Sequence, residues 1–283
     1  MIRYKILINN VFTLIRLKDW SKNIIIFLPL IFSGNLQNNN LYFDLFITFM
    51  LFSLTSSLIY IINDIIDIDD DKKHSLKIHK KPLASGKLSI KFALSLILII
   101  FIILSLGFIK YQIVYIHLIL YALINCAYSF FIKKIPILDV VLISIGYLIR
   151  LDVGSVVINV KTSIFLAGTI FFLACFIIFI KRFIELKNEF KTKRSKYFYS
   201  KKNLKIVIIL SSILFFLTLI LFTLIVDIRL LISIPLLILI FIRYYKSSIY
   251  YNLGEFPLDL IIRDKIILLT SSVVIVYTIY LYY

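Results

Sequence analysis

The stretch LFITFMLFSLTSSLIYIINDIIDIDDD, residues 45–71, joins a long apolar run to an abruptly acidic end. Its first 18 residues carry no charge, and its last eight hold five of the chain's 15 acidic residues. About 20 largely apolar residues in a helix are enough to cross a hydrocarbon core of about 30 Å. The stretch therefore predicts a membrane-spanning helix that ends in a cluster of carboxylates at the membrane edge.

The composition of the whole chain agrees with a membrane location. Hydrophobic residues make up 61% of the 283 positions, which leaves too little polar surface for a soluble domain. The net charge of +17 would suit binding to nucleic acid. In membrane proteins, however, Lys and Arg gather in cytoplasmic loops beside anionic lipid. We therefore predict an integral membrane protein with no nucleic-acid partner.

Apolar runs predict an all-α, polytopic membrane protein with nine spans in a single domain, residues 1–283. The spans are expected near residues 23–36, 41–62, 90–109, 111–131, 137–158, 163–180, 204–226, 229–243 and 264–283. The first and the eighth are short and contain Pro29 and Pro235. Residues 1–22 are interrupted by polar positions, which indicates an interfacial lead-in helix.

The distribution of basic residues predicts the orientation. With the N-terminus inside, the predicted cytoplasmic segments contain 28 of the 32 Lys and Arg residues. The external turns contain only Lys110, Lys161 and Arg229. This asymmetry predicts a multi-pass protein of the cell membrane, with two long cytoplasmic loops at about 63–91 and 181–205.

The acidic end of the second span has a spacing that suits a metal ion. On a continuous helix, Asn63, Asp64, Asp67 and Asp71 would share one face. Crowded carboxylates repel one another unless a cation lies between them, and Mg²⁺ is commonly held by a few carboxylates together with substrate phosphates. The alternative is a solvated acidic helix end that only terminates the span, although charges at a span boundary are often functional.

A basic segment, KKHSLKIHKKPLASGKLSIK at residues 72–91, follows directly. It could be an ordinary cytoplasmic loop whose charge only sets the orientation. It could also surround phosphate groups beside the metal, with its turn residues folding it back over the helix end. The basic candidates are Lys72, Lys73, His74, Lys77, Lys81 and Lys87. Carboxylates beside a phosphate-binding loop together predict a diphosphate leaving group.

These motifs resemble those of a known family. NDIIDIDDD is similar to the N-D-x-x-D-x-x-x-D motif of the UbiA superfamily of intramembrane prenyltransferases. RLKDWSKN (16–23), YSFFIKKIPILDV (128–140), KRFIEL (181–186) and GEFPLDLIIRDKIIL (254–268) resemble, in order, segments of its decaprenyl-phosphate phosphoribosyltransferase branch. The resemblance implies a nine-helix bundle with two cytoplasmic metal–diphosphate motifs above a lipid-lined cavity.

One departure from the superfamily bears on the substrate. Its second motif is usually D-x-x-x-D, whereas this chain has KRFIELKNE, in which Glu185 and Glu189 keep an acidic pair and Lys181 and Arg182 add positive charge. A mixed cluster suits a donor with additional phosphates, such as 5-phosphoribosyl 1-diphosphate, and a lipid phosphate as acceptor. Alternatively, Lys181 and Arg182 only anchor the helix at the membrane edge.

The resemblance and the chemistry together give a set of expected roles. Asp64, Asp67 and Asp71 would hold Mg²⁺ on the diphosphate and Asn63 would orient it, while Glu185 would bind a second metal or the ribose. Lys22, Lys81 and Arg182 are the expected phosphate contacts, and Lys81 is preferred to His74 because imidazole is largely neutral at pH 7. The further substrate-binding candidates are His74, Tyr128, Lys133, Arg150 and Lys181.

Three polar residues in the middle of the chain, Tyr128, Asp139 and Arg150, have more than one interpretation. Tyr128 and Asp139 could equally be satisfied polar groups between helices. Arg150 lies inside a span, where an unpaired charge is costly, so Asp139 or the lipid phosphate is its expected partner.

The predicted reaction is Mg²⁺-dependent transfer of 5-phosphoribose from 5-phosphoribosyl 1-diphosphate to a polyprenyl phosphate, with release of diphosphate. One alternative is transfer of a prenyl chain from its diphosphate to an aromatic or other small acceptor. A non-catalytic lipid carrier is another, but transporters usually place ionisable residues near the midplane, whereas here they gather at one face.

Overall fold

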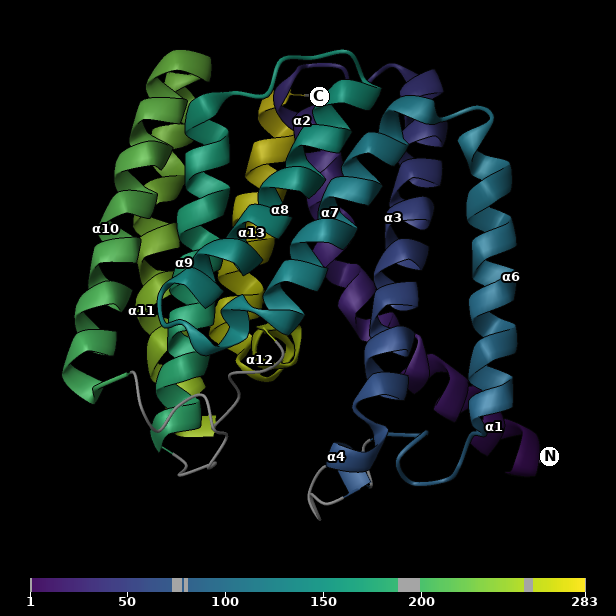
Figure 1. Cartoon of the computed structure of the whole chain (residues 1–283). Helices are drawn as coiled ribbons and strands as arrows, with labels where there is room; N and C mark the ends of the chain where they lie inside the picture. The colour runs from purple at the N-terminus through teal and green to yellow at the C-terminus, as the bar shows by residue number, and fades with distance from the viewer. Residues whose placement is uncertain (1, 73–77, 79–80, 188–198, 252–256, 283) are drawn as a thin grey trace.

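The computed structural model shows a bundle of helices (Figure 1). It describes residues 2–72, 78, 81–187, 199–251 and 257–282. His74 and Glu189 lie outside these ranges. All the regular secondary structure in the described part is helical, which confirms the predicted fold class.

The described elements follow one another without a strand. In order they are α1 (Ile2–Leu14), η1 (Leu17–Phe27), α2 (Leu28–Phe32), α3 (Asn39–Ile66), α4 (Ile68–Lys72), α6 (Ile90–Phe108), α7 (Gln112–Phe130), η2 (Ile132–Lys134), α8 (Leu138–Val157), α9 (Ile164–Lys187), α10 (Lys201–Val226), η3 (Ile228–Ser233), α11 (Ile234–Tyr251), α12 (Pro257–Arg263) and α13 (Lys265–Tyr282). Side-chain caps at Asn38, Ser89 and Ser200 accept backbone N–H groups at the starts of α3, α6 and α10.

Eight helical segments in the described part of the chain are long and apolar enough to cross a membrane. They correspond to the second through ninth predicted spans. The expected first span, 23–36, is not one continuous α-helix. It is divided between the 3₁₀-helix η1 and the five-residue α2, and Figure 1 shows this segment rising across the bundle from the end of α1.

Packing explains why the irregular segment is tolerated. Backbone groups outside an α-helical ladder can lie at membrane depth only where protein surrounds them. η1 packs against both α3 and α8, and its Asn23 and Ile26 side chains are buried, whereas Ile24 faces outward. Gly154 of α8 faces the carbonyl oxygen of Ile26, and a Cβ atom at this position would overlap that oxygen. The glycine thus permits the close contact between α8 and η1.

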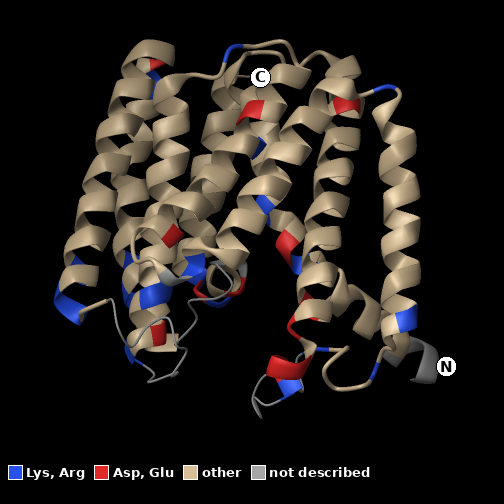
Figure 2. Cartoon of the chain, in the orientation of Figure 1, with Lys and Arg blue, Asp and Glu red and all other residues tan. Residues whose placement is uncertain are grey.

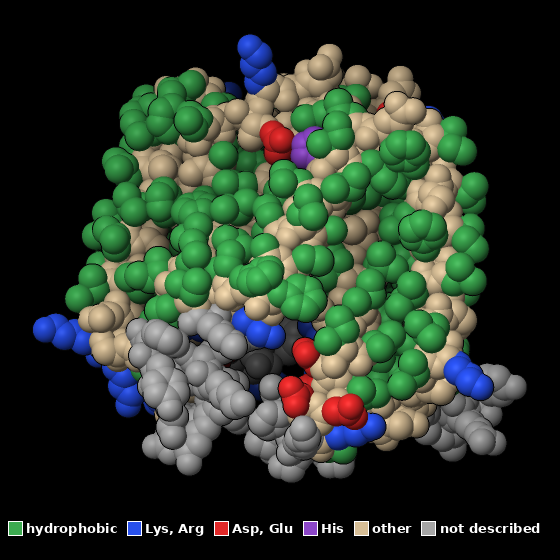
Figure 3. Space-filling view, in the orientation of Figure 1, with side chains coloured by type: hydrophobic (Ala, Val, Ile, Leu, Met, Phe, Trp, Pro, Cys, Tyr) green, Lys and Arg blue, Asp and Glu red, His purple; other side chains and the backbone are tan. Residues whose placement is uncertain are grey.

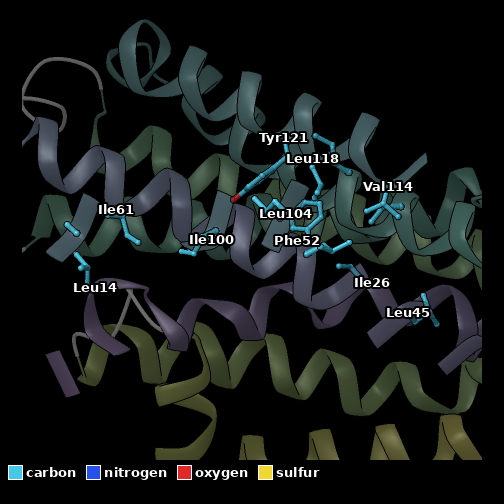
Figure 4. Packing of buried hydrophobic residues seen from close by; sticks show 14 of the residues in the cluster. Leu14, Ile26, Leu45, Phe52, Ile61, Ile100, Leu104, Val114, Leu118 and Tyr121 are labelled. Carbon is cyan, nitrogen blue, oxygen red and sulfur yellow. The ribbon is translucent and has the colours of Figure 1, made fainter. Parts of the chain in front are cut away.

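Apolar packing holds the bundle together. One core cluster joins side chains of α1, η1, α3, α6 and α7, among them Phe52, Leu118 and Tyr121 (Figure 4). A second cluster, which includes Phe176, Phe215 and Phe241, joins α9, α10 and α11. The outer surface is also apolar (Figure 3), as expected where lipid rather than water covers the helices.

Charged residues are concentrated at one edge of the bundle. We call this the acidic-motif edge, because it contains the end of α3 and helix α4. Figure 2 shows most of the Lys and Arg residues at the same edge, together with the start of the chain and the end of α9. The opposite edge, formed by the turns after α6 and α8, contains few charges. This agrees with the charge asymmetry from which the orientation was predicted.

Candidate active site

The acidic motif is not one continuous helix, contrary to the expectation from its spacing. Helix α3 ends at Ile66, Asp67 is its C-cap residue, and α4 begins at Ile68. Asp64 and Asp71 are each only 5% exposed, whereas Asp67 is exposed. The break in the helix therefore separates the three predicted metal ligands into two buried carboxylates and one exposed carboxylate.

Lys81 brings the two buried carboxylates together. Its Nζ atom lies 3.1 Å from Asp64 Oδ1 and 2.5 Å from Asp71 Oδ2. Arg16 adds a second cation, since its Nη2 donates to Asp64 Oδ1 at 3.0 Å. Its guanidinium also lies over the ring of Tyr60, 4.2 Å from the centroid. The predicted return of the basic segment over the helix end thus corresponds to a direct contact between Lys81 and the motif.

The oxygen atoms at this point suit a divalent cation. In the described part of the chain, no three His, Cys, Asp or Glu side chains form a group that could hold a metal by themselves. However, Asp64 and Asp71 already converge on one positively charged atom, Lys81 Nζ. Mg²⁺ is usually bound by one or two carboxylates, with phosphates and water completing its shell. The two carboxylates fit that donor set, with Asn63 and Asp67 nearby in the sequence.

A second cluster of charges surrounds Arg182, near the end of α9. Its Nε donates to Asp139 Oδ2 at 3.0 Å, and its Nη1 donates to Glu185 Oε2 at 2.8 Å. The Nη2 atom lies 3.4 Å from the hydroxyl of Tyr128. These partners come from α8, α9 and α7. The structure therefore groups four residues that the sequence had suggested separately.

Tyr199 completes this second cluster. Its hydroxyl donates to Asp139 Oδ1 at 2.7 Å and accepts the backbone N–H of Ile137 at 2.6 Å. Burial raises the pKa of Tyr199, and the Asp139 carboxylate raises it further, so the phenol stays protonated and acts as a donor. No sequence motif pointed to this residue, because it lies 60 positions from Asp139.

Arg150 does not pair with Asp139, the protein side chain that was expected to be its partner, because Asp139 pairs with Arg182. The Arg150 guanidinium donates instead to Asn23 Oδ1 at 2.6 Å, to the Tyr121 hydroxyl at 3.0 Å and to the Gly146 carbonyl. Asn23 in turn donates to Ser53 Oγ at 2.8 Å. Arg150 therefore links η1 to α7 and α8 inside the bundle.

The remaining candidates lie towards the same edge but outside these two clusters. Lys22 of η1 pairs with Asp19, with 2.6 Å between Nζ and Oδ1. Lys133 lies in η2, directly after α7, and is partly exposed. Lys181 is partly exposed beside Arg182. Arg16 entered the sequence interpretation only as a motif position, and its contact with Asp64 required the tertiary structure.

The surface is hollowed at the acidic-motif edge. Figure 3 shows a recess there, with acidic side chains on one side and basic side chains close to it. A water-soluble phosphorylated molecule could reach such an edge from solution, and a lipid headgroup could reach it from the membrane. The arrangement is therefore suited to a reaction between a soluble and a lipid substrate.

Known proteins resemble this chain in sequence and in structure. A decaprenyl-phosphate phosphoribosyltransferase of Corynebacterium glutamicum is 27% identical over 154 residues, which cover 53% of this chain and 46% of that protein. The protein of the same name from Mycolicibacterium smegmatis is 27% identical over 217 residues, or 74% of this chain and 68% of that protein. The chain thus spans about half of the first relative and two thirds of the second.

The fold has a counterpart among solved structures. A structure of digeranylgeranylglyceryl phosphate synthase matches 99% of this chain and 98% of its own chain, with a TM-score of 0.60 and 20% identity. At this identity the likeness shows the fold alone. The sequence model of the UbiA prenyltransferase family matches residues 24–254, which is most of the chain. The chain belongs to the UbiA prenyltransferase family.

Proposed function

We propose that this protein transfers 5-phosphoribose from 5-phosphoribosyl 1-diphosphate to a polyprenyl phosphate and releases diphosphate. The observation that carries the proposal is the convergence of Asp64 and Asp71 on Lys81 at the acidic-motif edge. This convergence supports the binding of a diphosphate at an edge that a soluble donor and a membrane lipid could both reach. The similarity to two proteins named decaprenyl-phosphate phosphoribosyltransferase favours phosphoribose as the transferred group.

The reaction exchanges one bond at C1 of the ribose for another. The bond between C1 and the diphosphate oxygen breaks, and an oxygen of the lipid phosphate forms a new bond to C1. The phosphate is already ionised at neutral pH, so the reaction requires no strong general base. Holding the two substrates in line would provide much of the rate enhancement.

The charged residues have distinct tasks in this scheme. Asp64 and Asp71, with Asp67 beside them, would hold Mg²⁺, which when bound neutralises the charge that develops on the leaving diphosphate. Lys81 would donate its hydrogen bonds to phosphate oxygens once the carboxylates have a metal as their partner. Arg16 keeps its bond to Asp64 and so holds that carboxylate in place.

The second cluster is proposed to bind the other end of the donor. Arg182 is held by Asp139 and Glu185, and a guanidinium fixed in this way could turn its remaining N–H donors to phosphate or ribose oxygens. Glu185 keeps the role predicted for it, which is to bind a ribose hydroxyl or a second metal. One strongly acidic cluster and one mixed cluster suit a donor that has both a diphosphate and a separate phosphate.

The test compares two labelled donors in membranes that contain the full chain. The protein is supplied with Mg²⁺ and decaprenyl phosphate, together with either labelled 5-phosphoribosyl 1-diphosphate or a labelled prenyl diphosphate with a small aromatic acceptor. Label should enter a polyprenyl-phosphoryl pentose from the first donor. Incorporation from the prenyl donor alone would refute the proposal.

Two substitutions in the acidic motif make the test specific. Asp71→Asn removes a buried carboxylate at Lys81 and should lower the transfer rate by about 100-fold. Asp69→Asn is the matched control, because Asp69 is exposed and pairs only loosely with Lys72, at 3.5 Å. Equal rates in the two variants would contradict the assigned role of Asp71.

A prenyl transfer is the second candidate function. The model of the UbiA prenyltransferase family matches residues 24–254, and the name of this family favours a prenyl group as the group transferred. Both candidate functions use a diphosphate leaving group bound at Asp64, Asp71 and Lys81. They differ in the group that the diphosphate leaves, which is a phosphoribosyl group in one and a prenyl chain in the other. The two-donor assay separates them directly.

A further inference from the structure

Tyr199 belongs to the cluster around Arg182, and neither the sequence motifs nor the proposed function assigns it a role. It precedes α10 and reaches the start of α8, where both of its hydrogen bonds end. A phenol can donate one hydrogen bond and accept others. Here the donor is directed at a carboxylate and the acceptor is occupied by a backbone N–H.

The carboxylate that Tyr199 contacts is buried and fully engaged. Asp139 is 3% exposed. Its Oδ1 accepts from Tyr199, and its Oδ2 lies 3.0 Å from Nε and 2.9 Å from Nη2 of Arg182. Each oxygen thus has its own partner, so the rotation of the carboxylate group is fixed by two different side chains.

The backbone contact anchors the hydroxyl itself. Ile137 has φ = 67° and ψ = −50°, a positive-φ conformation that is rare for a β-branched residue and persists only where surrounding contacts impose it. The Ile137 N–H that this conformation presents donates to the Tyr199 hydroxyl. The phenol is therefore fixed relative to the first turn of α8, the turn that contains Asp139.

We infer that Tyr199 is a positioning residue for donor binding: through Asp139 it sets the orientation of the Arg182 guanidinium towards the phosphorylated donor. This inference rests on the proposed function in one respect, that Arg182 contacts the donor. Without the hydroxyl, Asp139 Oδ1 loses its hydrogen bond and the carboxylate can rotate. Arg182 then loses the geometry in which Nε and Nη2 face one oxygen.

The test is the Tyr199→Phe variant of the full chain, compared with Tyr111→Phe. Tyr111 makes the same type of contact, from its hydroxyl to Asp44 Oδ1 at 2.9 Å, but it lies in the turn before α7, away from both clusters. We expect Tyr199→Phe to raise KM for the phosphorylated donor by about tenfold, the size of a hydrogen bond to a charged group. KM for the lipid acceptor and kcat should stay within about twofold. Tyr111→Phe should leave both KM values unchanged.

The outcomes distinguish a positioning role from a merely structural one. If Tyr199→Phe leaves the donor KM unchanged, or lowers only thermal stability as Tyr111→Phe would, the inference is wrong. Should Tyr199→Phe fail to fold, Asp139→Asn is measured instead. It keeps an oxygen for Tyr199 but removes the charge that faces Arg182, and an unchanged donor KM in this variant would also overturn the inference.

The inference and the proposed function can fail separately. Both variants are assayed with each of the two donors used above. If the unaltered protein uses only a prenyl diphosphate, the phosphoribosyl proposal fails. The effect of Tyr199→Phe on the KM of that prenyl donor then still decides whether Tyr199 positions Arg182.

Discussion

Replacement of Lys81 by Met tests how the charges of the first cluster, formed by Asp64, Asp71, Lys81 and Arg16, compensate one another. The Lys81 Nζ atom lies between Asp64 Oδ1 and Asp71 Oδ2, at 3.1 and 2.5 Å, and its side chain is 23% exposed. At an effective dielectric constant of about 20, the two contacts give roughly 5 and 7 kcal/mol of attraction, most of which is offset by desolvation. Asp64 retains Arg16, whereas Asp71 has no other cation among the described residues. We therefore expect a loss of about 3 kcal/mol, chiefly from unpaired Asp71.

Magnesium provides the decisive measurement. Thermal unfolding in detergent without Mg²⁺ should show Lys81→Met melting about 6 °C or more below the unaltered protein. Millimolar Mg²⁺ should restore much of this difference, because the two carboxylates then share a cation again. The matched control is Lys91→Met, since Lys91 is exposed at the start of α6 on the same edge. Two results would show that Asp64 and Asp71 do not form a shared cation site. The two variants could melt at the same temperature, or Mg²⁺ could raise the melting temperature of Lys81→Met no more than that of Lys91→Met.

Three further perturbations test other parts of the structure. Gly154→Ala places a Cβ on a carbonyl oxygen of η1 and should cost at least about 2 kcal/mol in thermal unfolding, whereas an unchanged melting temperature would contradict the close contact. Arg150→Lys cannot reproduce three hydrogen bonds in a planar fork and should lose about 2 kcal/mol, so full stability would show that the fork is dispensable. Burial alone would raise the pKa of Asp264, but hydrogen bonds from Ser247 and Arg243 hold it below the ordinary value. Its stabilisation should be complete above about pH 5 and decline as the pH falls below about 3.9, and denaturation curves for Asp264→Asn should lack this change.

Most of the spans could be predicted from composition because lipid imposes a simple requirement. A helix must be apolar over about 20 residues, and eight of the predicted runs meet this condition in the structure. The first span differs in its packing: η1 lies against both α3 and α8, with Asn23 and Ile26 buried between them. Sequence length and hydropathy do not report what surrounds a segment, so they could not distinguish η1 and α2 from a regular helix.

The candidate site likewise has features that could be predicted from the sequence and features that could not. The aspartates of residues 64–71 and the basic residues that follow are adjacent in sequence, so their pairing at the membrane edge could be predicted from the motif. The helix break at Asp67 could not be predicted in this way, and neither could the exposure of Asp67 beside the buried Asp64 and Asp71. Helical spacing alone had placed all three carboxylates on one face.

Local composition and adjacent residues were enough to predict the membrane fold class, the family and the edge at which charge gathers. The partners of Arg16, Asp139, Arg150 and Tyr199 could be identified only from the packed bundle. These side chains meet across helices far apart in the chain, as with Arg150 and Asn23 at a separation of 127 residues. A buried charge takes whichever polar group the packing brings within reach, and packing is a property of the whole bundle.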